Sequence, residues 1–287
     1  MPAIGVSTWV WASPLTDEVL ADLAVRAAGW GFDVLELPVE NVDDWSPARA
    51  ARVLGDHGLG ATVCLVMPPG RELVAASDQV IASTQDYLRR VVDIAVEVGS
   101  PVIAGPAYAS VGRTWRLSER ERVDTIRRLR DNLVPVVEHA RAAGVRVAVE
   151  PLNRYETSLL NTIGQTLDAL DGLPTDGCGV AVDVYHQNIE ERHVGDAIRS
   201  ARGRIAHVQV CANDRGAPGA DHLDWPDFLA ALEESGYSGP LCIESFTAHN
   251  ESIATAASIW RRLASTQDAL AVDGLRFLRA LMKESTR

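Results

Sequence analysis

Strand-like and helix-like segments alternate along the whole chain, and this alternation limits the possible folds more than any other feature. Runs of this kind, short, apolar and rich in β-branched residues, are typical of buried parallel strands. The longer segments between them carry apolar residues at helical spacing. The predicted strands are residues 4–9, 33–37, 60–66, 101–105, 145–150, 178–183, 204–210 and 240–245.

The segments between the strands also carry helix boundary signals. Apolar residues recur on one helical face through residues 78–98. Ser118 followed by Glu121 matches a capping box, which predicts a helix over residues 118–143. Glycine is the usual residue just past a helix end. The candidate helix ends are Gly29, Gly58, Gly99, Gly144 and Gly236.

The number of strand–helix pairs selects the fold class. Eight pairs in 287 residues, without a linker or a low-complexity stretch, predict a single (β/α)₈ TIM barrel domain over residues 1–287. A barrel of this kind typically needs about 250 residues. A doubly wound open sheet is the alternative. It is disfavoured because no G-x-G-x-x-G follows the first strand.

An acidic or amide residue closes each of the last four predicted strands. Any one of them could simply meet solvent at a strand end, but four in register favour a functional site. In a barrel, the carboxyl ends of the strands meet at the catalytic face. Three carboxylates and an amide oxygen suit a hard divalent cation, Mg²⁺ or Mn²⁺. The chain is therefore predicted to be a metal-dependent enzyme, with ligands Glu150, Asp183, Gln209 and Glu244.

Several strand-to-helix connections exceed the usual length of about two to six residues. Extra length at the catalytic face usually builds a substrate pocket. The long connections expected here are residues 106–117, 151–161, 184–192 and 211–223.

Charge and hydropathy exclude some classes of partner. A net charge of −12 argues against nucleic acid, which requires a basic surface. No apolar stretch approaches the roughly 18 residues of a membrane span. The N-terminus lacks the pattern of a secretory signal. We therefore expect a cytoplasmic protein.

The four cysteines lie far apart and form no C-x-x-C pair, so a thiolate metal site is not expected. Cys64, Cys178 and Cys242 are predicted to pack in the core. Cys211 follows Gln209 closely and could approach the site. A reducing compartment suits all four thiols.

Three motifs resemble the D-tagatose/D-psicose (allulose) 3-epimerase family, a branch of the xylose isomerase-like barrels. The resemblance extends over nearly the whole chain, from Phe32 to Arg261. The motifs are Glu150-Pro-Leu-Asn-Arg-Tyr-Glu156-Thr, Asp183-Val-Tyr-His186-Gln-Asn-Ile-Glu-Glu, and Asn213-Asp-Arg215-Gly-Ala-Pro-Gly219 followed by Trp225.

The resemblance implies roles for individual residues. Glu150, Asp183 and Glu244 match metal ligands, and Glu150 and Glu244 also match the catalytic acid/base pair. The family further implies a sugar substrate and a homo-oligomer, a dimer or a tetramer. Residues that match sugar-binding positions are Glu156, His186 and Arg215, with Trp11 and Trp115 expected to line the pocket.

The third ligand position departs from the family pattern. The epimerases usually carry an H-x-H strand, whereas this chain has His207-Val-Gln209. The related hydroxypyruvate isomerases commonly have Gln there, so an aldose–ketose isomerase acting at C1 and C2 is the alternative function. The amide oxygen is harder than imidazole, which favours Mn²⁺ or Mg²⁺, with Co²⁺ also possible. His207 lies on the same strand face as Gln209, and we expect it to pack in a layer or support the site.

The chemistry of these residues agrees with epimerisation. A cation that binds the carbonyl oxygen stabilises an enediolate, while one carboxylate removes a proton and the other returns one to the opposite face. The loop after the last strand, residues 245–250, has no glycine, which favours a free sugar over a phosphorylated one. An endonuclease IV-like enzyme is disfavoured by the acidic charge. A non-catalytic sugar-binding barrel would not need two metal-binding glutamates.

Overall fold

The computed structural model describes residues 2–285, and its strands form one closed parallel barrel. Each strand pairs with the next along the chain, and β8 closes the ring against β1. The predicted (β/α)₈ barrel is confirmed, and the open sheet is wrong. The strands are β1 (Ile4–Ser7), β2 (Val34–Val39), β3 (Gly60–Leu65), β4 (Val102–Gly105), β5 (Arg146–Val149), β6 (Cys178–Asp183), β7 (Ile205–Val210) and β8 (Leu241–Ile243).

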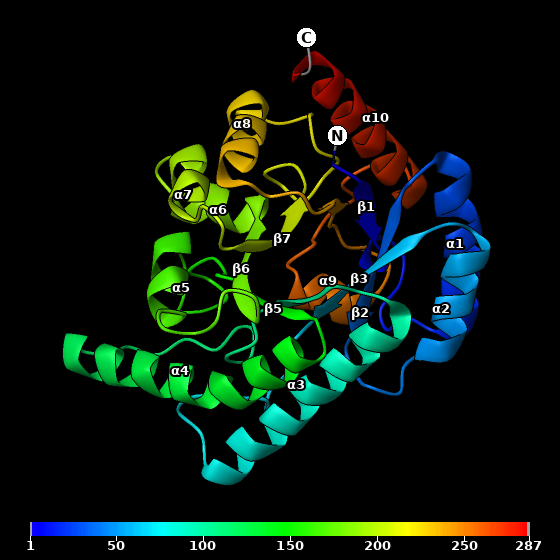
Figure 1. The fold of residues 1–287 in the computed structure, drawn as a ribbon. Helices are drawn as coiled ribbons and strands as arrows, with labels where there is room; N and C mark the ends of the chain where they lie inside the picture. The colour runs from blue at the N-terminus through cyan, green and yellow to red at the C-terminus, as the bar shows by residue number, and fades with distance from the viewer. Residues whose placement is uncertain (1, 286–287) are drawn as a thin grey trace.

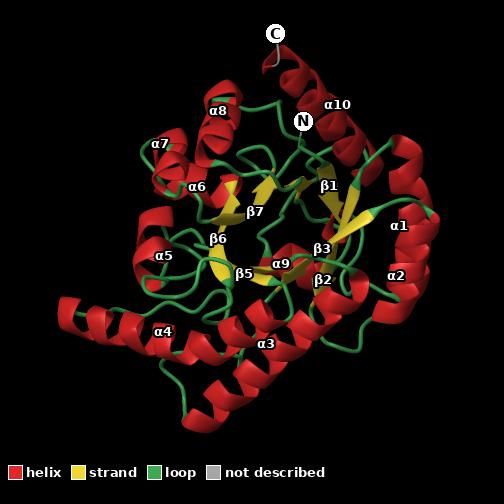
Figure 2. Cartoon of the chain, viewed as in Figure 1, coloured by secondary structure: helices red, strands yellow, loops and turns green. Residues whose placement is uncertain are grey.

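Helices surround the barrel on all sides, and α9 lies inside this ring (Figure 1, Figure 2). No helix within residues 2–285 combines the length and apolar character that crossing a membrane requires. The helices are the 3₁₀ turn η1 (Thr8–Val10), α1 (Asp17–Trp30), α2 (Pro47–Asp56), α3 (Asp78–Val98), α4 (Glu119–Ala142), α5 (Ile163–Ala169), α6 (Val184–Glu190), α7 (Val194–Ser200), α8 (Trp225–Ser235), α9 (Glu251–Ala256) and α10 (Gln267–Ser285).

The four predicted ligands all lie at the carboxyl ends of their strands. Asp183 is the last residue of β6, and it pairs in register with Gln209, the last but one of β7. Glu150 and Glu244 directly follow β5 and β8, so these two strands are shorter than predicted. Strand pairing stops just before Glu150 and Glu244, so both side chains lie at the mouth of the barrel.

One predicted loop is a helix. Residues 184–192 were expected to be a connection, but α6 (Val184–Glu190) begins immediately after β6. The reason is Asp183, whose Oδ1 accepts a hydrogen bond from the Tyr185 backbone N–H at 2.9 Å and so caps the new helix. Residues 66–77, between β3 and α3, form a long connection that the sequence did not predict.

The helix boundary signals were mostly correct. The capping box of α4 is confirmed, with Ser118 and Glu121 bonded reciprocally. Gly99 and Gly236 end α3 and α8 in the left-handed conformation. Gly29 is wrong as a helix end, because α1 continues to Trp30 and the left-handed residue is Gly31, with φ of 94°.

The core occupies the layer between the strands and the ring of helices. Val91 and Leu88 of α3, for example, are fully buried in the same cluster as Val63 of β3. All four cysteines are free and buried, which confirms the predicted core packing of Cys64, Cys178 and Cys242. This apolar layer holds the strands in register, so the positions of the strand-end side chains follow from it.

Candidate active site

The side chains from the four strand ends converge around one arginine, Arg215. Its Nη1 donates to Asp183 Oδ2 at 2.6 Å and to Glu244 Oε2 at 2.8 Å. Gln209 Nε2 donates to Glu244 Oε1 at 2.7 Å. These side chains and Glu150 are all buried. Groups that lie far apart in the sequence therefore form one polar cluster at the barrel mouth.

The cluster carries more negative than positive charge. Burial raises the pKa of Glu150 well above its usual range, and the charges of Glu244 and Asp183 raise it further. Burial likewise raises the pKa of Glu244. Burial alone would lower the pKa of Arg215, but Asp183 and Glu244 outweigh this effect, so the guanidinium stays charged. With all three carboxylates ionised, two negative charges remain uncompensated.

A divalent cation fits this charge and this set of donors. Glu150 and Asp183 each offer an oxygen within 4.8 Å of the other and of a His186 nitrogen. Glu244, which shares Arg215 with Asp183, lies beside them and adds further oxygen donors. Hard oxygen ligands at a site with an excess of negative charge suit Mg²⁺ or Mn²⁺.

Arg215 is held in position from both ends. Its backbone adopts a left-handed conformation, with φ of 69°, and Ser245 Oγ donates to its carbonyl oxygen at 2.6 Å. The guanidinium lies 4.0 Å from the ring centre of Tyr185 and 5.2 Å from that of Phe246. Cys211 approaches the site as expected, with its sulfur 3.8 Å from Arg215 Nη1. A charge fixed in this way can orient a ligand.

His186 presents a hydrogen-bond donor to the same cluster. The backbone N–H of Asn153 donates to its Nδ1 at 3.1 Å, which favours a ring hydrogen on Nε2, and Arg215 Nη2 lies 3.2 Å from that second nitrogen. Burial lowers the pKa of His186, which favours the neutral ring. Its Nε2 lies 3.4 Å from Asp183 Oδ2 and 3.5 Å from Glu150 Oε1.

Asn153, which the sequence analysis did not select, connects two of the predicted sugar-binding residues. Its Nδ2 donates to Glu156 Oε1 at 2.7 Å and lies 2.9 Å from His186 Nδ1. Its Oδ1 accepts from the Tyr155 backbone N–H at 3.0 Å, which fixes the orientation of the amide. The residue stands inside the motif that begins at Glu150, so the motif could have identified it.

A cavity of about 80 Å³ opens above the cluster. Its polar lining consists of five residues predicted from sequence, Glu150, Glu156, His186, Arg215 and Glu244. Its apolar wall includes Trp9, Phe246 and, from α9, Ile253. A small polar molecule in this cavity would contact carboxylates, a guanidinium and an imidazole on one side and aromatic rings on the other.

The structure does not bring the two predicted tryptophans to this cavity. Trp11 stacks on Trp30 at 5.9 Å between ring centres, and its Nε1 donates to Asp268. Trp115 hydrogen-bonds through its backbone to Ser158 and is absent from the cavity lining. Trp9 lines the cavity instead. The strand predicted over residues 4–9 ends at Ser7, and Trp9 belongs to the 3₁₀ turn η1 that follows it.

We expect Asn153→Asp to damage the site more than its small change in shape implies. An aspartate carboxylate cannot donate to Glu156 and would face it as a second negative charge. Turnover should fall by about 10- to 100-fold, the usual effect of removing a supporting hydrogen bond from a site. Asn132→Asp is the matched control, because Asn132 donates to the Leu73 carbonyl away from the cavity. Equal turnover in both variants would show that Asn153 has no such role.

Comparison with known proteins agrees with this geometry. Residues 24–281 match the family described as xylose isomerase-like TIM barrel. The chain is 33% identical to a probable ketose 3-epimerase from Synechocystis sp., over 96% of this chain and 95% of that protein. It is 31% identical to an L-ribulose 3-epimerase from Mesorhizobium japonicum, over 97% and 93%. A solved L-ribulose 3-epimerase matches with a TM-score of 0.91 at 29% identity, over 100% of this chain and 96% of the other.

Proposed function

Because the chain belongs to the xylose isomerase-like TIM barrel family, among its ketose 3-epimerases, we propose that it is a metal-dependent epimerase that inverts C3 of a free ketose. One observation carries the proposal. Glu150 and Glu244 are buried carboxylates from β5 and β8, both with raised pKa, and both line one cavity. This arrangement provides two proton-transfer groups around one small ligand.

The reaction needs a proton removed from C3 and another delivered to the opposite face. We assign these steps to Glu150 and Glu244, because both carboxylates line the cavity that would hold the sugar. His186 Nε2–H and Arg215 donate hydrogen bonds to the sugar oxygens near O1 and O2, and Glu156 accepts one. Trp9 and Phe246 provide an apolar wall against which the carbon atoms of the sugar can pack.

We propose that Glu150, Asp183, Gln209 and Glu244 hold the cation, which supplies Lewis-acid stabilisation of the negative charge that develops on the substrate oxygens. Oxygen donors favour Mn²⁺ or Mg²⁺, with Co²⁺ as the softer possibility. The resemblance supports a further proposal, a homo-oligomer, and the four free cysteines support a reducing, cytoplasmic location. The named relatives are epimerases, so an aldose–ketose isomerase is not favoured.

Deuterium labelling tests the function directly. We expect the Mn²⁺-loaded protein, incubated in D₂O with a panel of free ketoses, to produce an epimer that carries deuterium at C3. Removing the ion with a chelator should abolish the exchange, and adding Mn²⁺ should restore it. Deuterium only at C1 would identify aldose–ketose isomerisation. Exchange that continues at full rate after chelation would contradict metal dependence.

A further inference from the structure

The orientation of the Gln209 amide is determined by its neighbours. Its Nε2 lies 2.9 Å from Glu36 Oε1 and 2.7 Å from Glu244 Oε1. The amide nitrogen donates both of these hydrogen bonds, so the NH₂ end of Gln209 faces the two glutamates. The carbonyl oxygen, which is the end that could bind a cation, is therefore directed away from them.

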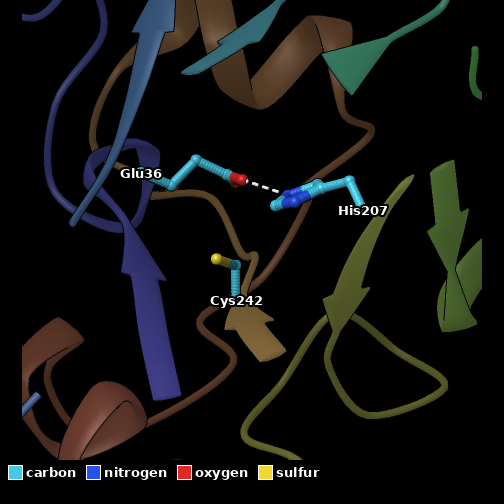
Figure 3. A group of neighbouring side chains, drawn as sticks. All are labelled: Glu36, His207 and Cys242. Carbon is cyan, nitrogen blue, oxygen red and sulfur yellow. Dashed lines mark hydrogen bonds and ion pairs between the residues drawn. The ribbon is translucent and has the colours of Figure 1, made fainter. Parts of the chain in front are cut away.

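Glu36 is itself held in one position inside the barrel. It extends from β2 toward His207 on β7, as Figure 3 shows. His207 Nε2 lies 2.5 Å from Glu36 Oε2, and the Thr62 hydroxyl donates to the same oxygen at 3.4 Å. Glu36 and His207 are both 0% exposed. One carboxylate oxygen is thus occupied by His207 and Thr62, and the other is left for Gln209.

Cys242 completes the group drawn in Figure 3. A carboxylate, an imidazole and a thiol within 4.8 Å could bind a zinc-like ion. However, His207 Nε2 and Glu36 Oε2 contact each other directly at 2.5 Å, which leaves no space for an ion between them. The Cys242 sulfur lies 3.5 Å from the Thr62 hydroxyl, which also bonds to Glu36. The group is better described as a hydrogen-bonded support than as a second metal site.

We propose that Glu36 is a positioning residue of the metal site. It holds the NH₂ group of Gln209, so that the amide presents its carbonyl oxygen to the cation, while His207 and Thr62 hold Glu36. A histidine at position 209 would bind the cation through a ring nitrogen. A glutamine can turn either its oxygen or its NH₂ group toward the cation, so it needs a neighbour that fixes its orientation. The inference rests on the metal site of the proposed function.

A double-mutant cycle in Mn²⁺ affinity tests this role. The metal-free wild type, Glu36→Gln, Gln209→Glu and the double variant are titrated with Mn²⁺ by calorimetry, and circular dichroism checks their folding. Glu36→Gln should weaken binding about 10- to 100-fold, as loss of a ligand's hydrogen-bond partner usually does. In the Gln209→Glu background the same change should cost much less, because a carboxylate presents oxygen at either end. Cys242→Ser should bind Mn²⁺ like the wild type.

Each outcome supports or overturns the proposal. Additive effects of the two changes would overturn it, because Glu36 would then act independently of Gln209. The proposal would also be overturned if the wild type bound two ions per chain and Cys242→Ser bound only one. Glu36, His207 and Cys242 would then form a metal site of their own. A wild type that binds no Mn²⁺ would instead refute the proposed metal-dependent function. If Glu36→Gln does not fold, Glu36→Asp is the substitute, because it keeps the carboxylate but shortens the side chain so that it no longer reaches Gln209. Unchanged Mn²⁺ affinity in Glu36→Asp would overturn the positioning role of Glu36.

Discussion

Glu150→Gln and Glu244→Gln should each lower turnover by a factor on the order of 10² to 10⁴, while the protein still folds and binds metal. Glutamine keeps an oxygen that can ligate a cation but cannot take up a proton at the pH of the reaction. Both carboxylates line the cavity, where the nearest other titratable ring is His186, 3.5 Å from Glu150. The measurement is kcat with a ketose substrate, together with Mn²⁺ affinity and the melting temperature.

Glu72→Gln is the matched control for this pair. Glu72 is also a buried carboxylate, but it pairs with Arg113 at 2.7 Å outside the cavity. We expect this variant to lose stability and keep its turnover. Full activity in either Glu150→Gln or Glu244→Gln would eliminate the mechanism with two carboxylates. Loss of Mn²⁺ binding in a folded variant would assign that glutamate to the ion rather than to proton transfer alone.

Arg215→Met should destabilise the metal-free protein strongly. Removing one partner of a buried ion pair typically costs about 3–5 kcal/mol, because the remaining charges stay buried without compensation. Asp183 and Glu244 would both lose their close cation. The cost should decrease at acidic pH, where protonation removes the charge of Glu244, and increase as the pH rises through the raised pKa of that carboxyl. Mn²⁺ should restore part of the stability, because it supplies positive charge at the same place.

Urea unfolding with and without Mn²⁺, at several pH values, measures this effect. Arg261→Met is the control, since Arg261 is exposed and pairs with Asp214 at the surface. Its loss should cost at most about 1 kcal/mol and should not depend on the metal. If Arg215→Met behaves like this control, then Arg215 does not balance the charge of the site.

The barrel and most of the site could be predicted because their determinants are local. Buried parallel strands need continuous apolar runs, which are visible in the sequence at each predicted strand. Asp183 and Gln209 stand at the ends of such runs, and the closed barrel requires the ends of parallel strands to meet at one face. The position of a residue in the chain was therefore enough to place it near the others.

Other features depended on local geometry that the pattern did not show. Trp9, rather than Trp11, reaches the cavity because the first strand ends at Ser7 and the chain turns into η1. Residues 184–192 begin with helix α6 because the Asp183 side chain caps that helix. The same side chain is also part of the polar cluster at the barrel mouth. The first strand ended two residues earlier than predicted, whereas β6 ended as predicted and a helix followed it without a loop.

By itself, the sequence determined the architecture, the strand-end carboxylates and the excess of negative charge, because each follows from residue type and order along the chain. Only the tertiary structure decided which partners these groups have. Arg215 lies between Asp183 and Glu244, and Glu36 faces Gln209 although 173 positions separate them. The physical reason is that a hydrogen bond depends on a few tenths of an ångström and on direction. Barrel closure sets both of these quantities across strands that are distant in the chain.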